Sequence, residues 1–368
     1  MSIYSRRRDF FCLTAAFLLG TAMVACNSGS KPQSGASQNS IQIIGAGSSF
    51  IYPAMTHWVG DYQASHPGVQ INYQSIGSGG GIQQLKDGVL DFGASDAALD
   101  DQQLKEMPPL VQIPESAGPV CMTYNLPELK TPLKLTAETL SGIYLGKIKS
   151  WRDAAIKKDN PGLALPNYGI VVAHRADGSG TTNIFTTYLA QVSPAWEKQV
   201  GKGISVNWPV GLGGKGNEGV TGVVKNTPGG IGYVELIYAT QNNLPVALLR
   251  NRAGNWILPS AASATAAIDA FSVELNKDVR APIVDAPATA KDAYPITGLT
   301  FLLVPLTGKT AAKGQAVRDF VEYIVGPGQG EAEKMEYAKL PAAVQQQDEN
   351  LLAQVKGQSN QAAANAHQ

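Results

Sequence analysis

Short apolar runs alternate with helix-like segments in the first part of the chain. Residues 41–44, 69–74 and 89–95 have the length and composition of buried strands. A helix-like segment around Trp58 follows the first run, and a second such segment, residues 82–87, follows the next. This alternation of strands and helices predicts α/β units built on largely parallel sheets.

The pattern changes little in the later parts of the chain. Two apolar runs bounded by prolines, residues 108–114 and 119–125, lead into a section at 135–292 that has strands and helices of its own. This section can form a second domain. A strongly apolar run at residues 299–305 predicts a further strand, and residues 312–325 predict a long helix. The pattern alone does not show whether this last section returns to the first domain.

Three of the predicted strands pass into a helix through a turn rich in glycine and hydroxyl side chains. The turns read GAGSSF at residues 45–50, IGSGGG at 76–81, and HRADGSGTT at 174–182, the last between an apolar run at 169–173 and a helix-like run at 182–191. Unpaired N–H groups and the helix dipole attract anions to such helix N-termini. The turns therefore predict an anion cradle, with Ser49 and Ser78 among its donors.

The third turn is the most informative because it adds a permanent positive charge. Arg175 can make a two-pronged contact to a tetrahedral oxyanion, while Ser179, Gly180 and Thr181 offer hydroxyls and a close backbone approach. A helix cap is the structural alternative, because Ser and Thr at a helix N-terminus commonly satisfy the helix's own donors. A cap explains one hydroxyl but not the arginine. Asp177 would repel an anion, so we expect it to orient Arg175 through a salt bridge.

Asp96 stands at the C-terminal end of the strand predicted at residues 89–95. Open α/β sheets bind ligands outside the carboxyl ends of their strands, so Asp96 can share one edge with Ser49 and Ser78. A carboxylate among donors suits only a ligand that brings a proton. Hydrogen phosphate carries one and sulfate at neutral pH does not, so Asp96 is predicted to discriminate between them.

The first 26 residues are predicted to direct export. Arginines at residues 6–8 precede an uncharged apolar run, residues 10–25, that is short for a membrane span. Ala25 before Cys26 resembles a lipoprotein cleavage site, although Met23 replaces the usual leucine, and Cys26 would then carry the lipid. Ordinary signal-peptide cleavage nearby is the alternative. The arginines leave both Sec and twin-arginine export open.

Composition and charge narrow the class of protein. The chain has 368 residues, is 44% hydrophobic and 16% charged, and has no formal net charge. These values indicate a globular protein with room for two domains and give no reason to expect nucleic-acid binding. Only Cys121 of the three cysteines falls in the predicted folded part, so no internal disulfide is expected. Neither cysteines nor histidines have metal-ligand spacing, so no metal site and no cofactor is predicted.

One motif could indicate a dinucleotide-binding enzyme. GLGGKG at residues 211–216 fits G-x-G-x-x-G, and Glu235 lies about 20 residues further on. The turn at residues 228–230 cuts the intervening helix short, however, and the motif does not open a domain. Lys215 is followed by glycine, which excludes a Walker loop. His174 is expected to be a strand-end residue rather than a catalyst.

Five motifs together resemble the substrate-binding proteins of bacterial phosphate-specific ABC transporters. They are GAGSSF (45–50), IGSGGG (76–81), DFGASD (91–96), RADGSGT (175–181) and GLGGKGN (211–217). The resemblance runs from about residue 41 to residue 341. It implies an α/β, two-lobed type II periplasmic-binding-protein fold. Each lobe would be a mixed, mostly parallel sheet flanked by helices, with the ligand in a cleft between the lobes.

The resemblance also implies a discontinuous domain organisation. Its parts are a signal peptide (1–25), a lipidated flexible tether (26–40), lobe 1 (41–122 and 296–345), lobe 2 (123–295) and a Gln/Ala/Asn-rich C-terminal tail (346–368). By motif position, the implied phosphate contacts are Ser49, Phe50, Ser78, Asp96, Arg175, Ser179, Gly180 and Thr181. Phe50 would contribute its backbone N–H. Ser49 replaces the threonine usual in the family and keeps the hydroxyl, while Gly79 and His174 also depart from the family pattern. The glycine-rich loop at 211–217 is interpreted as structural.

The sequence therefore predicts a binding protein and not an enzyme. The expected function is high-affinity binding of inorganic phosphate outside the cytoplasmic membrane and delivery to the permease and ATPase subunits of an ABC transporter. A monomer in the periplasm or at the cell surface is expected, held to a membrane only through the lipid on Cys26. One alternative is a binding protein for another oxyanion, such as sulfate or molybdate. The other is a secreted phosphatase with Ser179 as nucleophile, for which the sequence offers no base or metal cluster.

Overall fold

The computed structural model describes residues 40–356. The predicted signal peptide, the lipidation site at Cys26 and nearly all of the tether lie outside the described residues, as does the end of the predicted tail. Within residues 40–356, none of the helices combines the length and the hydropathy needed to cross a bilayer.

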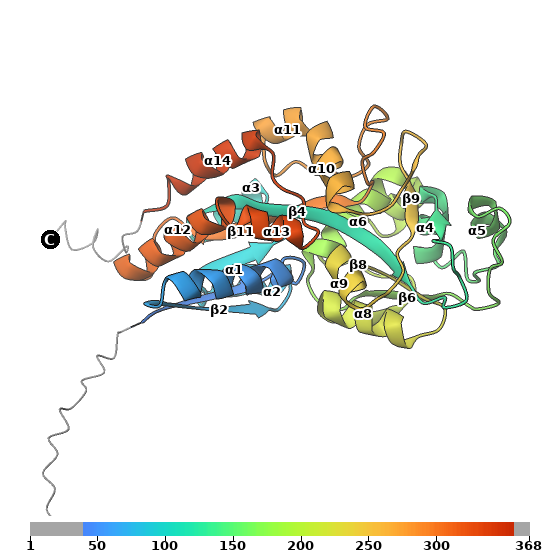
Figure 1. Cartoon of the computed structure of the whole chain (residues 1–368), viewed down its shortest axis with the longest axis horizontal. Helices are drawn as coiled ribbons and strands as arrows, with labels where there is room; N and C mark the ends of the chain where they lie inside the picture. The colour runs from blue at the N-terminus through green and yellow to red at the C-terminus, as the bar shows by residue number, and fades with distance from the viewer. Residues whose placement is uncertain (1–39, 357–368) are drawn as a thin grey trace, which may run out of the picture. The chain divides into compact units, whose positions relative to one another are not determined.

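One mixed sheet of eight strands organises the described chain (Figure 1). In sheet order the strands are β2 (Val69–Ser75), β1 (Ile41–Gly47), β3 (Phe92–Ser95), β11 (Thr297–Pro305), β4 (Leu110–Tyr124), β8 (Gly230–Glu235), β6 (Val171–Arg175) and β7 (Leu212–Gly214). The pairs β1–β2, β1–β3, β6–β7 and β6–β8 are parallel, whereas β3–β11, β11–β4 and β4–β8 are antiparallel. A small second sheet contains β5 (Lys134–Leu135), β9 (Leu248–Arg250) and β10 (Trp256–Ile257).

Helices pack against the two sheets and against one another. They are α1 (Tyr52–Ser65), α2 (Ser78–Lys86), α3 (Asp101–Lys105), α4 (Ala137–Tyr144), α5 (Ala154–Asp159), α6 (Gly180–Val192), α7 (Pro194–Gln199), α8 (Gly216–Asn226), α9 (Leu236–Gln241), α10 (Ala261–Ala270), α11 (Ser272–Lys277), α12 (Ala311–Val325), α13 (Gln329–Lys334) and α14 (Ala342–Leu352). The predicted strand at 299–305 and helix at 312–325 correspond to β11 and α12. The helix predicted at 82–87 begins earlier, at Ser78, which brings that hydroxyl to a helix N-terminus.

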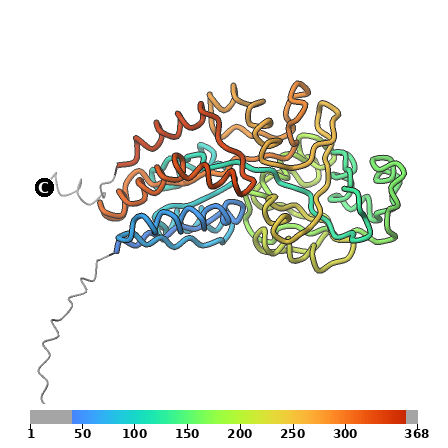
Figure 2. The backbone as a smooth tube through the Cα atoms, viewed as in Figure 1, coloured from blue at the N-terminus to red at the C-terminus, as the bar shows by residue number. Residues whose placement is uncertain are grey.

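The long strand β4 joins two halves of the sheet. Residues 110–119 of β4 pair with β11, and residues 120–124 pair with β8. We call β1, β2, β3 and β11 with their helices the first half, and β6, β7 and β8 with theirs the second half. Figure 2 shows the blue N-terminal and red C-terminal segments side by side in the first half, with green-to-yellow segments in the second.

The structure has one strand where the prolines indicated two separate runs, at 108–114 and 119–125. Pro114 lies beside a register shift against β11, and Pro119 lies where β4 changes partner to β8. Proline lacks an N–H and is tolerated in sheets at such irregular points. The register shift leaves Glu115 without an opposite residue, so Glu115 is the extra residue of a β-bulge.

Both faces of the first half are covered by apolar cores. Successive strand residues point to opposite faces, so Leu302 of β11 joins one core and Leu303 joins the other. The first core includes Trp58 of α1 and Phe320 of α12, and the second includes Ile268 of α10. A strand buried on both faces reads as a continuous apolar run, which explains why β11 was evident in the sequence.

The last section of the chain returns to the first half. β11 lies between β3 and β4, and α12 packs against β1. Helices α10 and α11 pack against β4, β11 and α14, so core contacts cross the lobe boundary predicted at residue 295. The tail predicted from residue 346 starts inside α14, whose Leu352 is buried. The lobe boundaries themselves stay a prediction.

Gly81 lies where α2 packs closely on β1. An added Cβ would lie 2.6 Å from the Gly47 Cα and 2.7 Å from the carbonyl oxygen of Ala46. Because both atoms belong to backbone, α2 would have to move. We expect Gly81→Ala to lower the free energy of unfolding by about 1–3 kcal/mol in urea denaturation.

Gly60 provides the matched control inside α1. Among the described residues, a Cβ added at Gly60 would have no atom within 4 Å apart from its chain neighbours and the backbone of its own helix. Gly60→Ala should therefore raise the free energy of unfolding by about 0.5–1 kcal/mol, because alanine loses less backbone entropy in a helix. Similar effects of the two substitutions would contradict the close packing of α2 on β1.

Candidate functional site

The predicted site residues converge where strand ends and helix starts of both halves meet. They are Ser49 and Phe50 after β1, Ser78 at the start of α2, Asp96 after β3, Arg175 at the end of β6, and Ser179, Gly180 and Thr181 at the start of α6. All of them are buried. Because their polar groups are shielded from water, these groups must form hydrogen bonds with one another or with a polar ligand.

The Ser78 hydroxyl connects the two halves. It accepts hydrogen bonds from the N–H of Asp96 at 3.3 Å and from the N–H of Gly180 at 3.0 Å. Beside it, the Gly79 N–H donates to the Gly178 carbonyl at 2.9 Å. A Cβ at Gly180 would lie 2.6 Å from the backbone nitrogen of Asp96, so only glycine permits this approach. The N-terminal turns of α2 and α6 therefore face each other directly.

Arg175 brings a buried positive charge to this meeting point. Its Nε and Nη2 donate to the two oxygens of Asp177 at 2.8 and 2.6 Å, and its Nη1 lies 3.4 Å from Thr181 Oγ1. Burial by itself would lower the pKa of Arg175. The hydrogen bonds and the charge of Asp177 raise it by more, so the pKa lies above its usual value. Burial raises the pKa of Asp177, and the same ion pair brings it below its usual value. Both groups stay charged, and Nη1 is left facing Thr181.

Asp96 is the acceptor among these donors. One carboxylate oxygen accepts a short hydrogen bond from the Ser48 hydroxyl, and the other lies 3.4 Å from Thr181 Oγ1. Burial raises the pKa of Asp96 to about 6, with the Ser48 hydrogen bond and the charge of Arg175 acting in the opposite direction. The carboxyl group can therefore gain or lose a proton close to neutral pH.

Ser179 caps α6. Its hydroxyl accepts from the N–H of Thr182 at 3.0 Å, and its own N–H donates to the carbonyl of Ile204 at 2.8 Å. The cap considered as an alternative in the sequence is thus present for this hydroxyl. Capping occupies a lone pair, so the hydroxyl proton of Ser179 can still be donated to another acceptor.

Tyrosine side chains hold the turn after β1. The Phe50 N–H donates to Ser48 Oγ at 2.9 Å, and the Phe50 carbonyl accepts from Tyr337 at 2.6 Å. The carbonyl of Ser49 accepts from Tyr238 at 2.5 Å. Tyr238 belongs to α9 of the second half, so this turn is anchored from both halves.

Two contacts in this region were not predicted from the sequence. Asn217 donates to Ser49 Oγ at 3.0 Å and to Thr181 Oγ1 at 3.2 Å, although its glycine-rich loop was interpreted as structural. Ser48, rather than its neighbour Ser49, supplies the hydroxyl bonded to Asp96. The only signal for Asn217 was its place in the motif at 211–217, which resembles a family feature, and two adjacent serines look alike in a sequence.

Burial and then the charge of Asp96 raise the pKa of two further carboxyl groups, Glu115 and Glu235. Glu115, the bulge residue of β4, accepts from Thr300 at 3.0 Å, and Glu235 accepts from the N–H of Ile237 at 2.9 Å. Within residues 40–356, one oxygen of each glutamate has no hydrogen-bond partner. Burial raises the pKa of Glu115 to about 8 against the Thr300 hydrogen bond, and the charge of Asp96 adds to the rise. Burial also raises the pKa of Glu235 well above its usual value.

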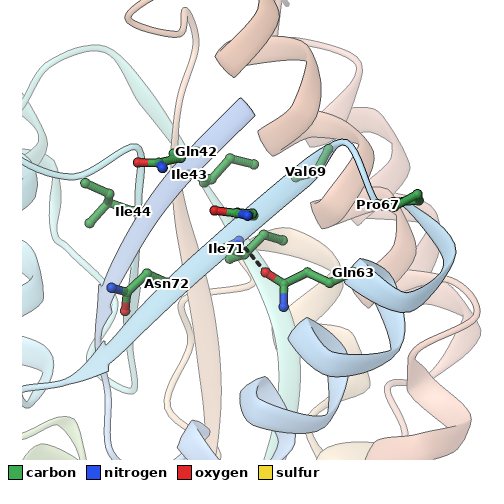
Figure 3. A pocket seen from close by; sticks show the side chains of 9 residues that line it. Gln42, Ile43, Ile44, Gln63, Pro67, Val69, Ile71 and Asn72 are labelled. Atoms are coloured by element: carbon green, nitrogen blue, oxygen red, sulfur yellow. Dashed lines mark hydrogen bonds between the residues drawn. The ribbon is translucent and has the colours of Figure 1, made fainter. Parts of the chain in front are cut away.

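A cavity of about 560 Å³ lies beside the edge strand β2 (Figure 3). None of the predicted site residues lines it, and the Gln63 side chain accepts from the N–H of Ile71 there at 2.6 Å. A smaller cavity of about 60 Å³ lies next to Asp96, with Asn183 and Thr297 in its wall. Converging polar groups, rather than cavity size, therefore mark the candidate site.

Histidine and cysteine side chains, which can bind metals or act in catalysis, make other contacts in this structure. In the part of the chain that the structure describes, no group of three His, Cys, Asp or Glu side chains could hold a metal ion. His174 stacks on Trp208 with ring centres 4.9 Å apart, and its Nδ1 lies 2.9 Å from the carbonyl oxygen of Arg175. Cys121 is buried, and burial raises the pKa of its thiol.

The sequence is similar to several proteins of known name. A family model described as the PBP superfamily domain matches residues 32–327. The phosphate-binding protein PstS of Xylella fastidiosa (strain Temecula1) is 46% identical over 311 residues, covering 84% of each chain. PstS of Haemophilus influenzae is 42% identical over 303 residues, covering 82% of this chain and 90% of that protein. PstS of Methanocaldococcus jannaschii is 40% identical over 324 residues, covering 82% of each chain.

The fold is also similar to solved structures. A high-affinity periplasmic phosphate-binding protein (PfluDING), bound with phosphate, matches with a TM-score of 0.67 at 22% identity, covering 83% of this chain and 92% of that chain. A phosphate binding protein from Stenotrophomonas maltophilia matches with a TM-score of 0.63 at 18% identity, covering 87% of this chain and 99% of that one. At such low identities these two comparisons show the shared fold.

The buried state of Glu115 predicts a pH-dependent stability. Its pKa is about 8 in the folded protein against 4.5 for a free glutamate, so the folded protein holds the extra proton between these values. Burying this carboxyl therefore costs more stability as pH rises through that window. Glu115→Gln has no proton to lose. Relative to wild type, its free energy of unfolding should rise by about 2–4 kcal/mol from about pH 5 to about pH 8.

Glu106→Gln is the control for this measurement. Glu106 forms an exposed ion pair with Lys86 at 2.8 Å, and its side chain is 58% exposed. Its difference from wild type should change little with pH, because exposed pairs contribute little to stability. Urea denaturation at several pH values measures both variants. If the free energy of unfolding of Glu115→Gln relative to wild type were equally independent of pH, Glu115 would not be held neutral.

Proposed function

Because this chain belongs to the PBP superfamily and to the family of PstS phosphate-binding proteins, we propose that it binds inorganic phosphate and delivers it to an ABC permease for import. Its α/β fold is the two-lobed type II fold of periplasmic binding proteins. We take the two halves joined by β4 as the lobes, with phosphate bound where they meet.

The convergence of donors from both halves around one carboxyl group carries this proposal. Ser78, Arg175, Thr181 and Asp96 lie in one connected network at the facing N-terminal turns of α2 and α6. Such turns and a guanidinium suit an anion. Charge-assisted hydrogen bonds contribute about 1.5–3 kcal/mol each. A few of them, net of ordering costs, are enough for micromolar affinity, about −8 kcal/mol.

We assign the phosphate contacts by chemical role. Backbone N–H groups would come from Phe50 and Gly180, hydroxyls from Ser49, Ser78, Ser179 and Thr181, the charge from Arg175, and the acceptor for the phosphate proton from Asp96. In the present conformation the Gly180 N–H bonds to Ser78, and the Phe50 N–H bonds to Ser48. Phosphate would exchange these internal contacts for its own oxygens as the lobes part and close again. Asp177 would act through Arg175.

The alternatives from other classes are less well supported. Another oxyanion such as sulfate or molybdate would bring no proton for Asp96, whose pKa of about 6 leaves it ionised at neutral pH. A phosphatase using Ser179 would need a base beside it. The Ser179 hydroxyl instead caps α6, and His174 is stacked on Trp208. These contacts favour a binding protein over an enzyme.

Export and anchoring complete the proposal. The arginine-led apolar segment before Cys26 supports export and lipidation, which would place the protein in the periplasm or at the cell surface, tethered through residues 26–40. A monomer is supported by the surface of the described residues. Their exposed large hydrophobic side chains, Tyr52, Val89, Leu212, Leu258 and Val273, are few and come from separate segments.

Isothermal titration of the purified protein with four oxyanions tests the function. Phosphate and arsenate share a tetrahedral shape and a proton, so both should bind with micromolar or tighter affinity. Sulfate and molybdate should bind at least about 100-fold more weakly, because an ionised Asp96 would face an unprotonated oxygen. Tight sulfate binding with weak phosphate binding would overturn the selectivity, and turnover of a phosphate ester would contradict a binding-only role.

Asp96→Asn tests the selector directly. The amide can donate to a sulfate oxygen and no longer repels it, so the preference for phosphate over sulfate should fall by about 10- to 100-fold. In the wild-type protein the same preference should weaken as pH falls through about 6, where Asp96 takes up a proton. The variant should lack this pH dependence.

Asp91→Asn is the matched control for Asp96→Asn. Asp91 is also buried and next to β3, but it pairs with Lys313 at 3.0 Å and accepts from the N–H of Ile44. Its substitution should lower stability and leave the preference for phosphate unchanged. If Asp96→Asn discriminated between the two anions as well as Asp91→Asn does, Asp96 would not be the selector.

A further inference from the structure

We propose that Asn217 is a positioning residue that forces the hydroxyls of Ser49 and Thr181 to act as hydrogen-bond donors toward the bound anion. This inference rests on the proposed function and extends it to a residue outside the predicted contacts. Asn217 lies in the first turn of α8, in the second half, and is fully buried. It contacts Ser49 of the first half and Thr181 of α6, so one side chain spans the meeting point of the halves.

The orientation of the Asn217 amide is set by the backbone. Its Oδ1 accepts from the N–H of Glu235 at 3.0 Å. With the oxygen occupied by a donor, Nδ2 must point the other way, toward Ser49 Oγ at 3.0 Å and Thr181 Oγ1 at 3.2 Å. Both hydrogens of Nδ2 are therefore used, and all polar atoms of the side chain are paired. A flipped amide would set Nδ2 against an N–H group and leave both hydroxyls without it.

The Ser49 hydroxyl has only its proton left to offer. A hydroxyl has two lone pairs and one proton. Ser49 Oγ accepts from Asn217 twice, from the backbone N–H at 3.1 Å and from Nδ2 at 3.0 Å. Both lone pairs are thereby occupied. The next contact that Ser49 makes must be to an acceptor, and an oxyanion is made of acceptors.

The Thr181 hydroxyl is constrained in the same direction. Its oxygen receives Nδ2 of Asn217 at 3.2 Å and lies 3.4 Å from Nη1 of Arg175. Its proton points toward Oδ2 of Asp96 at 3.4 Å. This last bond is long and can be exchanged for one to an anion in the same place. Asn217 thus sets the proton direction in two hydroxyls, while Asp96 alone stays an acceptor.

Free hydroxyl groups could rotate and serve a ligand as donor or acceptor. Fixing their protons before the ligand arrives avoids reorganisation on binding and penalises ligands that need an acceptor there. A purely structural asparagine, holding α8 to β8 through Glu235, would also lower stability when removed. The two roles differ in one respect: only a positioning role makes the contribution of Ser49 depend on Asn217.

A double-mutant cycle separates the two roles. Phosphate affinity is measured by isothermal titration for wild type, Asn217→Ala, Ser49→Ala and the double variant. Each single substitution should weaken binding by about 10-fold or more. The effect of Ser49→Ala should be several-fold smaller in the Asn217→Ala background, because the freed hydroxyl no longer points its proton at the ligand. Losses that multiply would overturn the positioning role, as would an unchanged affinity of Asn217→Ala.

Asn160→Ala is the matched control. Asn160 is also buried and makes three side-chain bonds, to both backbone groups of Lys134 and to the carbonyl of Ile156, all within residues 134–160. Thermal unfolding without phosphate should show that both asparagine variants are destabilised. Only Asn217→Ala should lose phosphate affinity. A similar loss for Asn160→Ala would mean that affinity follows stability, which would overturn the inference.

Asn217→Asp keeps the shape of the side chain. It replaces Asn217→Ala as the test variant if the alanine variant does not fold. Its carboxylate accepts from Ser49 and Thr181 and turns both protons away from the ligand. Phosphate binding should fall below that of wild type by more than about 10-fold, and adding Ser49→Ala should change it little. If wild type binds phosphate and Ser49→Ala still weakens this variant fully, the inference alone fails. If wild type does not bind phosphate, the proposed function fails and the inference falls with it.

Discussion

The buried guanidinium of Arg175 is the charge around which the rest of this region has to be arranged. Its side chain is 1% exposed, and because arginine keeps its charge in proteins, this buried charge needs a compensating carboxylate. Asp177 supplies this carboxylate. It accepts two hydrogen bonds from Arg175 and a further one from the N–H of Gly216 at 3.1 Å, where α8 begins. The ion pair thus ties the turn after β6 to the turn after β7. Removing one partner of such a buried pair costs about 3–5 kcal/mol.

The buried carboxyl groups avoid an uncompensated buried charge in a different way. Among the described residues, neither Glu115 nor Glu235 forms an ion pair. Burial raises the pKa of Glu235 well above its usual value and that of Glu115 to about 8, so Glu115 stays neutral near pH 7. Asp96 has the Ser48 hydroxyl and the charge of Arg175, and its pKa rises only to about 6. One persistent cation and one carboxylate poised to exchange a proton suit an anion that carries a proton itself. The stability lost by burying these acids is the cost of that arrangement.

The strand β4 links the two halves without a break in the backbone. Its first part is held by β11 and its last part by β8, and the partner changes at Pro119. The bulge at Glu115 lies a few residues before that point. Bulges next to functional sites commonly turn a side chain in a new direction, and here the bulge coincides with the buried, neutral Glu115. The geometry of the strand and the electrostatics of the site therefore depend on each other.

Local chemistry in the sequence was enough to predict many of the elements and the polar residues that converge between the two halves. Gly/Ser turns between strand and helix form locally, and Arg175 and Asp177 are close enough along the chain to pair at the end of one strand. The sequence could not show that β4 is continuous, that Ser48 rather than Ser49 contacts Asp96, or that Glu115 is the bulge residue. Nor could it show that Asn217 spans Ser49 and Thr181. Each of these depends on contacts between residues far apart in the chain, and the direction of a hydroxyl proton follows from all its neighbours at once, which only the tertiary structure brings together.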